Sequence, residues 1–373
     1  MTNPKLHIVC LDAPSPPDYG GAIDMFCKIK ALAESGRDIT LHYFHYKEGR
    51  GTKGLEQYCR EVHSYPRSSF VNSLLHRQPY IVHSRINAAL VKQLNQDKDP
   101  VLMEGLHCAG IVPLLNNNNR LIVVRMHNDE AAYYGQLAKA SGTSLRKLYF
   151  KLESSLLAKY QHNLDKHLTL ACISMKDMEA LKITYGMKDL HYVPAFTPWQ
   201  QQTTLEGRGD YCLYHGNLAV PENEQIAEWL IIEVFSKITT PFAIAGKGIS
   251  KKLESAAKSL SHVSLVSSPS DAELDTLIQN AQINILPSLN STGLKLKLLH
   301  AIFMGRHCVT NLAGVDGTEF TNAVTLCNTA DDYVKAITRL MEQSFSKEEE
   351  IKRIAVSETY NNALNAAKLN ALL

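Results

Sequence analysis

The sequence predicts an α/β protein built from two doubly wound parallel sheets. A strand at 6–11, a helix at 22–35 and a strand at 39–44 form a β-loop-α-β unit, which is typical of parallel sheets. The same alternation restarts at 211–215, after a stretch at 194–210 that is rich in proline, glutamine and glycine. We interpret this stretch as a linker, so the pattern predicts two Rossmann-like domains that face a central cleft.

The other expected elements continue the alternation. The first half is predicted to hold strands at 101–103, 121–125 and 168–174 and helices at 145–164 and 176–184. The second half is predicted to hold strands at 242–245, 263–266, 283–286, 307–310 and 324–327 and helices at 222–235, 271–281, 330–341 and 347–372. The domains are therefore expected at 1–195 and 196–349, with a last helix at 350–373 that packs back on the first domain.

Composition narrows the class of protein. The 373 residues are 45% hydrophobic and 20% charged, which argues against disorder, and a net charge of +2 gives no attraction to nucleic acid. The eight cysteines are scattered without a Cys-x-x-Cys pair, so a disulfide framework or zinc site is not expected. No signal-peptide core or 18-residue apolar run occurs. We expect a cytoplasmic protein.

The loop and helix at 287–305 form the most informative segment. Residues of N-cap type, Asn290 to Thr292, precede a helix that is expected to begin at Gly293 and to end at Gly305. Free N–H groups and the helix dipole attract anions at such a start. At helical spacing Lys297 and His300 share one face, which suits a diphosphate at the loop and a sugar or nucleoside along the helix. An ordinary cap with solvated lysines is the alternative.

Several motifs occur in an order that resembles one known family. They are Gly20-Gly21, the segment 125–130 (RMHNDE), Ile173-Ser174 with Asp177 and Glu179, the segments 214–218 (YHGNL) and 244–248 (IAGKG), and the segment 293–305. This order resembles the bacterial GT-B glycosyltransferases, specifically the retaining, glycogen-synthase-like group that uses nucleotide-sugar donors. The resemblance spans nearly the whole chain.

The resemblance implies a site on each domain. The implied catalytic residue is His127, which alternatively satisfies a backbone group at a strand end. The implied donor-binding residues are Gly216, Asn217, Gly246, Lys247, Thr292, Gly293, Leu294, Lys297 and His300. The implied acceptor-side residues are Tyr19, Gly20, Gly21, Asp129 and Glu130, of which the glycines alternatively form a simple turn and the carboxylates a helix cap. No metal or other cofactor is expected, because lysines and helix N–H groups neutralise the leaving phosphate.

The sequence departs from the family at the donor site. The family carries two glutamates, and their positions hold Thr292 and His300 here. The family's diphosphate-binding arginine and lysine are also missing, and Asn223 stands near the expected lysine. Lys297 and Lys247 are our candidates to replace that charge.

The predicted function is retaining transfer of a sugar from a nucleotide-diphosphate sugar to a glycan or lipid-linked acceptor in bacterial surface-polysaccharide biosynthesis. The missing glutamates leave two alternatives, a catalytically silent GT-B module that binds nucleotide or glycan, and a nucleotide-sugar epimerase. A basic amphipathic segment at 69–76 is either an ordinary surface helix or a peripheral contact with the inner face of the membrane.

Overall fold

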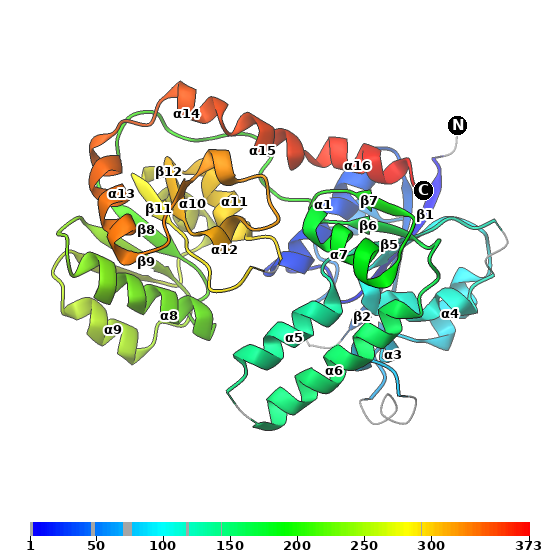
Figure 1. The fold of residues 1–373 in the computed structure, drawn as a ribbon. Helices are drawn as coiled ribbons and strands as arrows, with labels where there is room; N and C mark the ends of the chain where they lie inside the picture. Colours follow the sequence, from blue (N-terminus) through cyan, green and yellow to red (C-terminus); the bar gives the residue numbers. More distant parts are fainter. Residues whose placement is uncertain (1–2, 46–48, 70–76, 117–118, 143, 292) are drawn as a thin grey trace. The chain divides into compact units, whose positions relative to one another are not determined.

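The computed structural model describes residues 3–45, 49–69, 77–116, 119–142, 144–291 and 293–373. The chain divides into two compact units. The first unit comprises Met1–Pro198 with Tyr360–Leu373, and the second comprises Trp199–Thr359. Each unit contains one parallel sheet (Figure 1), so the predicted α/β class with two doubly wound sheets is confirmed.

Among the described residues, seven parallel strands form the sheet of the first unit in the order β3-β2-β1-β4-β5-β6-β7. The strands are β1 (Lys5–Cys10), β2 (Asp38–His45), β3 (Glu61–Pro66), β4 (Val101–Glu104), β5 (Ile122–Met126), β6 (Thr169–Cys172) and β7 (Leu190–Tyr192). The chain adds β2 and β3 on one side of β1 and then places β4 on the other side. The topological switch point of this sheet therefore lies between β1 and β4, where ligands of doubly wound sheets bind.

Helices cover both faces of this sheet. They are α1 (Gly20–Glu34), α3 (Tyr80–His83), α4 (Ala88–Leu94), the 3-10 helices η1 (Glu56–Tyr58) and η2 (Leu106–Leu114), α5 (Glu130–Ala140), α6 (Ser144–His162), α7 (Met175–Tyr185) and α16 (Asn362–Asn370). α5 and α6 pack side by side, and α16 packs against α1 (Figure 1).

The core of the first unit follows the alternation of the strands. In β1, Leu6, Ile8 and Cys10 point to the face that α1 and α16 cover, whereas Val9 belongs to the cluster on the opposite face. Because both faces are covered, the central strands are apolar nearly throughout.

The second unit has the same plan. Among its described residues, six parallel strands follow the order β10-β9-β8-β11-β12-β13. The strands are β8 (Cys212–His215), β9 (Phe242–Gly246), β10 (Val263–Ser267), β11 (Ile283–Ile285), β12 (His307–Thr310) and β13 (Thr325–Leu326). The helices are α8 (Pro221–Trp229), α9 (Lys251–Lys258), α10 (Asp271–Asn280), α11 (Leu296–Met304), α12 (Leu312–Val315), the 3-10 turn η4 (Thr321–Ala323), α13 (Ala330–Glu342), α14 (Lys347–Ile351) and α15 (Ile354–Thr359). Its switch point lies between β8 and β11.

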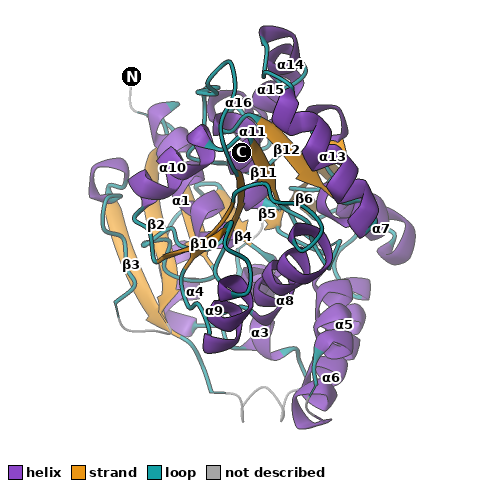
Figure 2. Ribbon diagram, turned by 90° about the vertical axis from the view of Figure 1, so that its left-hand side faces the viewer, coloured by secondary structure: helices purple, strands orange, loops and turns teal. Residues whose placement is uncertain are grey.

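Three expectations about elements were wrong or incomplete. The helix expected at 347–372 is three short helices, because the Arg353 side chain turns inward to the carbonyls of Ile302 and Gly305 and Asn361 caps a new helix. The helix expected at 222–235 changes to a π-helix, η3 (Leu230–Phe235), after α8. The edge strands β3 and β7 were not predicted, because their sequences lack the apolar run that marks buried strands. Figure 2 shows β3 at the edge of the sheet, beside β2.

Two expectations about membranes have different outcomes. The segment expected as an amphipathic helix at 69–76 lies, apart from Ser69, outside the described residues. Among the described helices, none combines the length and the apolarity that crossing a bilayer requires.

Candidate functional site

His127 lies just beyond the carboxyl end of β5, as predicted, and is almost fully buried. Its Nε2 is 3.1 Å from Oε2 of Glu104, the last residue of β4. Since a carboxylate oxygen can only accept, Nε2 of His127 donates this hydrogen bond, and Nδ1 is the nitrogen that Glu104 does not use.

A buried charge cluster supports this histidine. Lys28 of α1 donates to Asp24 at 2.5 Å and to Glu104 at 2.8 Å, and Arg125 of β5 donates to Asp24 at 3.2 Å. Burial alone would raise the pKa values of both carboxyls, but Lys28 holds them below their usual range. Two cations and two carboxylates thus balance beneath His127.

Our sequence analysis did not identify Asp24, Lys28 and Glu104 as site residues. The available signal was the spacing of Asp24 and Lys28, one helical turn apart on the apolar face of α1. Charges on a buried helix face need partners, and this spacing is the signal by which a buried ion pair on α1 could have been recognised.

Asp129 is the N-cap of α5, which is the alternative that the sequence left open. Its Oδ1 accepts from the N–H groups of Ala131 at 3.1 Å and Ala132 at 3.2 Å and from Gln161 at 3.0 Å. Glu130 follows it and is buried. Burial raises the pKa of Glu130 to about 7, and the negative charge of Asp129 adds to this shift.

The glycine pair lies where α1 begins. Tyr19 is the N-cap residue, and Gly20 and Gly21 form the first turn. The Tyr19 hydroxyl donates to Oδ2 of Asp12 at 3.1 Å, and the guanidinium of Arg50 lies 5.0 Å from the centre of the Tyr19 ring. These contacts fix the loop after β1, which borders the switch point of the first sheet.

The two glycine turns of the second unit touch each other. A Cβ on Gly246 would lie 1.9 Å from the carbonyl oxygen of Gly216, so a glycine is required there. The Leu218 N–H donates to the carbonyl of Lys247 at 2.8 Å, which ties the loop after β8 to the loop after β9. Lys247 itself is exposed.

The Lys297 side chain extends from α11 to Tyr214 of β8 and Asn223 of α8. Its Nζ donates to Oδ1 of Asn223 at 3.1 Å and to the hydroxyl of Tyr214 at 3.3 Å. Asn223 in turn donates to the carbonyl of Asn217 at 2.9 Å. The ammonium of Lys297 therefore lies beside the position where the family resemblance expected a lysine. Burial lowers the pKa of Lys297 to about 8.

His300 lies on the same helix face, one turn further. Its ring stacks on Trp199 with 4.3 Å between ring centres, and its Nε2 is 2.8 Å from Oδ1 of Asp275. Burial lowers its pKa. The ring of His215, at the end of β8, meets His300 edge to face, and among the described residues nothing bonds its buried Nε2. We had assigned no role to Trp199 or His215.

The helix start at 290–296 differs from the expectation. α11 begins at Leu296 rather than at Gly293, and its N-cap residue, Lys295, makes no side-chain cap bond. The Lys295 ammonium instead folds back onto Asn290 at 2.9 Å and the carbonyl of Gly293 at 3.2 Å, and Gly293 has φ of 66°. Gly293 and Leu294 are thus loop residues, and Thr292 lies outside the described residues.

Glu222 of α8 organises the same loop. Its Oε1 accepts from the Leu289 N–H at 3.1 Å and its Oε2 from the Asn290 amide at 2.6 Å. Local sequence patterns could not reveal this role, because the two partners are more than 60 residues away.

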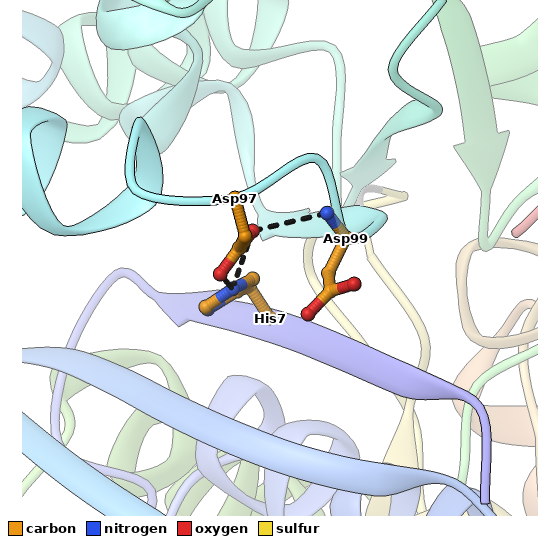
Figure 3. Close-up of side chains that lie close together, drawn as sticks. All are labelled: His7, Asp97 and Asp99. Carbon is orange, nitrogen blue, oxygen red and sulfur yellow. Dashed lines mark hydrogen bonds and ion pairs between the residues drawn. The ribbon is translucent and has the colours of Figure 1, made fainter.

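Two groups of side chains have the spacing of metal ligands within the described residues. In the first, Asp24, Glu104 and His127, the Lys28 ammonium already holds the place of a cation between the two carboxylates. In the second, the Asp97 carboxylate lies 3.1 Å from His7 Nε2 and accepts from the Asp99 N–H at 3.0 Å (Figure 3).

The second group lies at the amino end of β4, away from the predicted site. There Asp97 also accepts from Arg120 at 3.2 Å, and His7 bonds His42 at 2.9 Å. The hydrogen-bonded series of rings continues from Nδ1 of His42 to the hydroxyl of Tyr65 at 3.0 Å. These contacts satisfy the group as a hydrogen-bonded network across three strands.

Known proteins resemble this chain in sequence and in fold. Residues 209–343 match the family model described as glycosyl transferases group 1. An uncharacterised 44.6 kDa protein in the cps region of Klebsiella pneumoniae is 28% identical over 333 residues, which cover 84% of each protein.

Solved structures match both units. Sucrose-phosphate synthase from Thermosynechococcus elongatus has a TM-score of 0.70 at 14% identity, over 99% of this chain and 98% of that one. A point mutant of S. aureus TarM, in complex with fondaparinux, α-GlcNAc-glycerol and UDP, has a TM-score of 0.66 at 11% identity over 99% of both chains. WaaG, a glycosyltransferase involved in lipopolysaccharide biosynthesis, scores 0.61 at 15% identity over 98% of both. At these identities the likeness establishes the fold, which is GT-B.

Proposed function

We propose that this chain, which has the GT-B fold and a group 1 glycosyl transferase domain at 209–343, transfers a sugar, with retention of configuration, from a nucleoside-diphosphate sugar to a glycan or lipid-linked acceptor. One observation carries the proposal. Lys297 is a half-buried cation at the switch point of the group 1 domain, beside the turn that begins with Gly216. Among the described residues, the hydrogen-bond partners of its ammonium are neutral groups, and such a partly desolvated cation is suited to an anionic ligand.

The proposed donor site uses the residues around this ammonium. The leaving diphosphate lies against Lys297 and the loop that Glu222 holds, where positive charge offsets the charge that develops on the phosphate. The nucleoside lies toward His300, whose Nδ1 makes no hydrogen bond to the described residues and can bond a ribose hydroxyl. We propose that no metal is needed, since Lys297 supplies the charge, and that the donor phosphate takes the acceptor proton.

The first unit supplies the acceptor side in this proposal. His127 presents Nδ1 because Glu104 fixes the other nitrogen, and the buried cluster beneath it keeps the imidazole in one orientation. The ring can then hydrogen-bond a hydroxyl of the transferred sugar or of the acceptor.

A thermal-shift panel tests the donor site. The full chain is melted with UDP, GDP, ADP, dTDP and CMP at about millimolar concentration, at which even micromolar ligands raise the melting temperature. One nucleotide should stabilise the wild type and fail to stabilise Lys297→Ala. Lys252→Ala, which removes an exposed lysine paired with Glu228 in the same unit, is the matched control and should respond as the wild type does. If no nucleotide stabilises the folded wild type, the donor site is refuted.

We propose bacterial surface-glycan assembly as the setting, supported by the relative in a cps region. A feature of α6 supports peripheral contact with the inner face of a membrane. Leu145, Leu148 and Leu152 form an exposed apolar stripe at helical spacing, and the exposed neighbours Arg146, Lys147 and Lys151 are all basic. Apolar and basic groups on one helix suit anionic lipid surfaces.

Co-sedimentation with vesicles of phosphatidylglycerol and phosphatidylethanolamine tests this contact. Leu148→Glu should reduce the bound fraction severalfold, whereas Ile183→Glu, at an exposed apolar position of α7, should not. Equal binding by both variants and the wild type would remove α6 from the proposal.

A further inference from the structure

Arg85 is a buried cation whose guanidinium is only partly used by the protein. It is 4% exposed and follows α3. Its Nε donates to the carbonyl of Leu11 at 2.7 Å, and its Nη1 donates to the carbonyl of Ile81 at 2.7 Å and to the Ser84 hydroxyl at 3.4 Å. Within the described part of the chain, Nη2 makes no hydrogen bond. These bonds hold the guanidinium in one orientation and leave one of its nitrogens unused.

Other buried arginines of the chain show what a purely structural arginine does. Arg353 places both terminal nitrogens on backbone carbonyls, those of Ile302 and Gly305 for Nη1 and that of Arg306 for Nη2. Arg120 holds two carbonyls and also donates to the carboxylate of Asp97 at 3.2 Å. Arg85 has neither a complete set of carbonyls nor a hydrogen-bonded carboxylate.

A second guanidinium lies next to it. Arg67 donates to the same Ser84 hydroxyl at 3.5 Å, and its guanidinium carbon lies 5.3 Å from the centre of the Tyr80 ring. Two positive groups that converge on one buried hydroxyl repel each other, and the charge of Arg67, after burial, lowers the pKa of Arg85 to about 10. An anion between the two groups would relieve this repulsion.

Arg85 and Arg67 lie near the switch point of the first sheet, where doubly wound sheets bind ligands. Leu11 follows β1 and Gly105 follows β4, and these are the two strands that flank the switch point. His107 lies over Gly105, since a Cβ there would be 2.8 Å from its Nδ1, and this Nδ1 is buried with no partner in the described chain. Burial and the charge of Arg85 lower the pKa of His107 well below its usual value, so the ring is neutral.

From this juxtaposition we infer that Arg85, Arg67 and His107 form a subsite for a phosphoryl group of the acceptor, at the switch point between β1 and β4. Two cations and one neutral ring nitrogen reach the site from different elements, which suits the several oxygens of a tetrahedral phosphoryl group better than a planar carboxylate. The inference rests on the proposed transferase function and names the class of acceptor, a phosphorylated one. Asp12 and Glu130 also lie within electrostatic reach of Arg85, so the subsite is not uniformly positive.

Calorimetric titration with inorganic phosphate tests the subsite. The full chain carries Lys297→Ala in this experiment, so that phosphate binding at the proposed donor site does not contribute to the signal. Adding Arg67→Gln should weaken phosphate binding about tenfold or more, because a charge-assisted bond is lost. Arg67 is half-buried, so this variant should remain folded. Arg85→Lys should weaken phosphate binding by a similar factor. Arg120 is the matched control, a buried arginine at the other end of the sheet, and Arg120→Lys should leave phosphate binding unchanged.

Competition identifies the source of the phosphoryl group. Glucose 1-phosphate and geranyl diphosphate, added separately, represent a sugar phosphate and a lipid diphosphate, and displacement of phosphate by either supports the subsite. Unchanged phosphate affinity in folded Arg67→Gln and Arg85→Lys overturns it, as does binding of glucuronate without binding of phosphate. Because the site lies in the first unit, failure here leaves the nucleotide result at Lys297 unaffected, and the reverse also holds.

Discussion

Glu130 shows how burial, together with nearby negative charge, changes the pKa of one residue. It is 3% exposed, and Asp129 and Asp177 add negative charge nearby, so its pKa rises to about 7. A carboxyl whose pKa in the folded protein exceeds its unfolded value binds more protons in the native state. Stability must therefore fall as the pH rises from about 4.5 to about 7, by about 3 kcal/mol for a shift of this size.

Glu130→Gln should remove this dependence. Relative to the wild type, the variant should gain stability between pH 5 and pH 8, as measured by urea unfolding followed by circular dichroism. Glu34→Gln, at an exposed position of α1, should follow the wild-type profile. Parallel profiles for Glu130→Gln and the wild type would show that Glu130 ionises normally.

Lys297 gives a second prediction at the residue scale. Its pKa of about 8, lowered by burial, means that the free protein loses this charge as the pH rises through 8. Affinity for the nucleoside diphosphate should therefore decline between pH 7 and pH 9 in the wild type. Lys297→Arg keeps its charge throughout this range and should show a flat profile in the same titration, if it binds. A flat wild-type profile would contradict the role of Lys297.

At the scale of elements, the glycine turns after β8 and β9 pack directly against each other. Both glycines were predicted from sequence, but only the structure separates their roles. A Cβ on Gly246 would collide with the Gly216 carbonyl at 1.9 Å, whereas a Cβ on Gly216 would meet only the Asn223 side chain at 3.5 Å, an ordinary contact.

Gly246→Ala should therefore force the two loops apart. We expect a loss of about 3 kcal/mol in stability, together with loss of nucleotide binding. Gly216→Ala is the matched substitution and should cost less than about 1 kcal/mol. Equal melting temperatures for the two variants would contradict the observed packing of the turns.

The elements also show what the sequence could predict. Apolar runs located the central strands, and the turn after each strand located most candidate residues. The start of α11 was misplaced because Lys295 folds back on the loop, a contact that no cap pattern encodes. The roles of Glu222 and Glu104 depend on partners distant in sequence, so local patterns could not reveal them.

At the scale of the whole molecule, the chain returns to its first unit. α16 packs against α1, and Ala366 and Leu369 are fully buried in the core that also contains Leu6 and Ile8. The last helix thus belongs to the unit whose first strand begins at Lys5.

Leu369→Ala should destabilise the first unit alone. A cavity of this kind costs about 2–4 kcal/mol. Hydrogen exchange should accelerate in α1 and β1 and remain unchanged in residues 199–359. Leu364→Ala, at an exposed position of α16, is the control and should change neither. Faster exchange in both units would mean that they unfold together.

The central claim is that the chain transfers a sugar from a nucleoside-diphosphate donor. The most direct measurement incubates the full chain with the nucleotide sugar that matches the stabilising nucleotide and with a lipid-linked glycan acceptor, and follows the anomeric proton by NMR. The account predicts release of nucleoside diphosphate, a product with the anomeric configuration of the donor, and no turnover by Lys297→Ala. A donor that binds but is never consumed, or a product of inverted configuration, would contradict it.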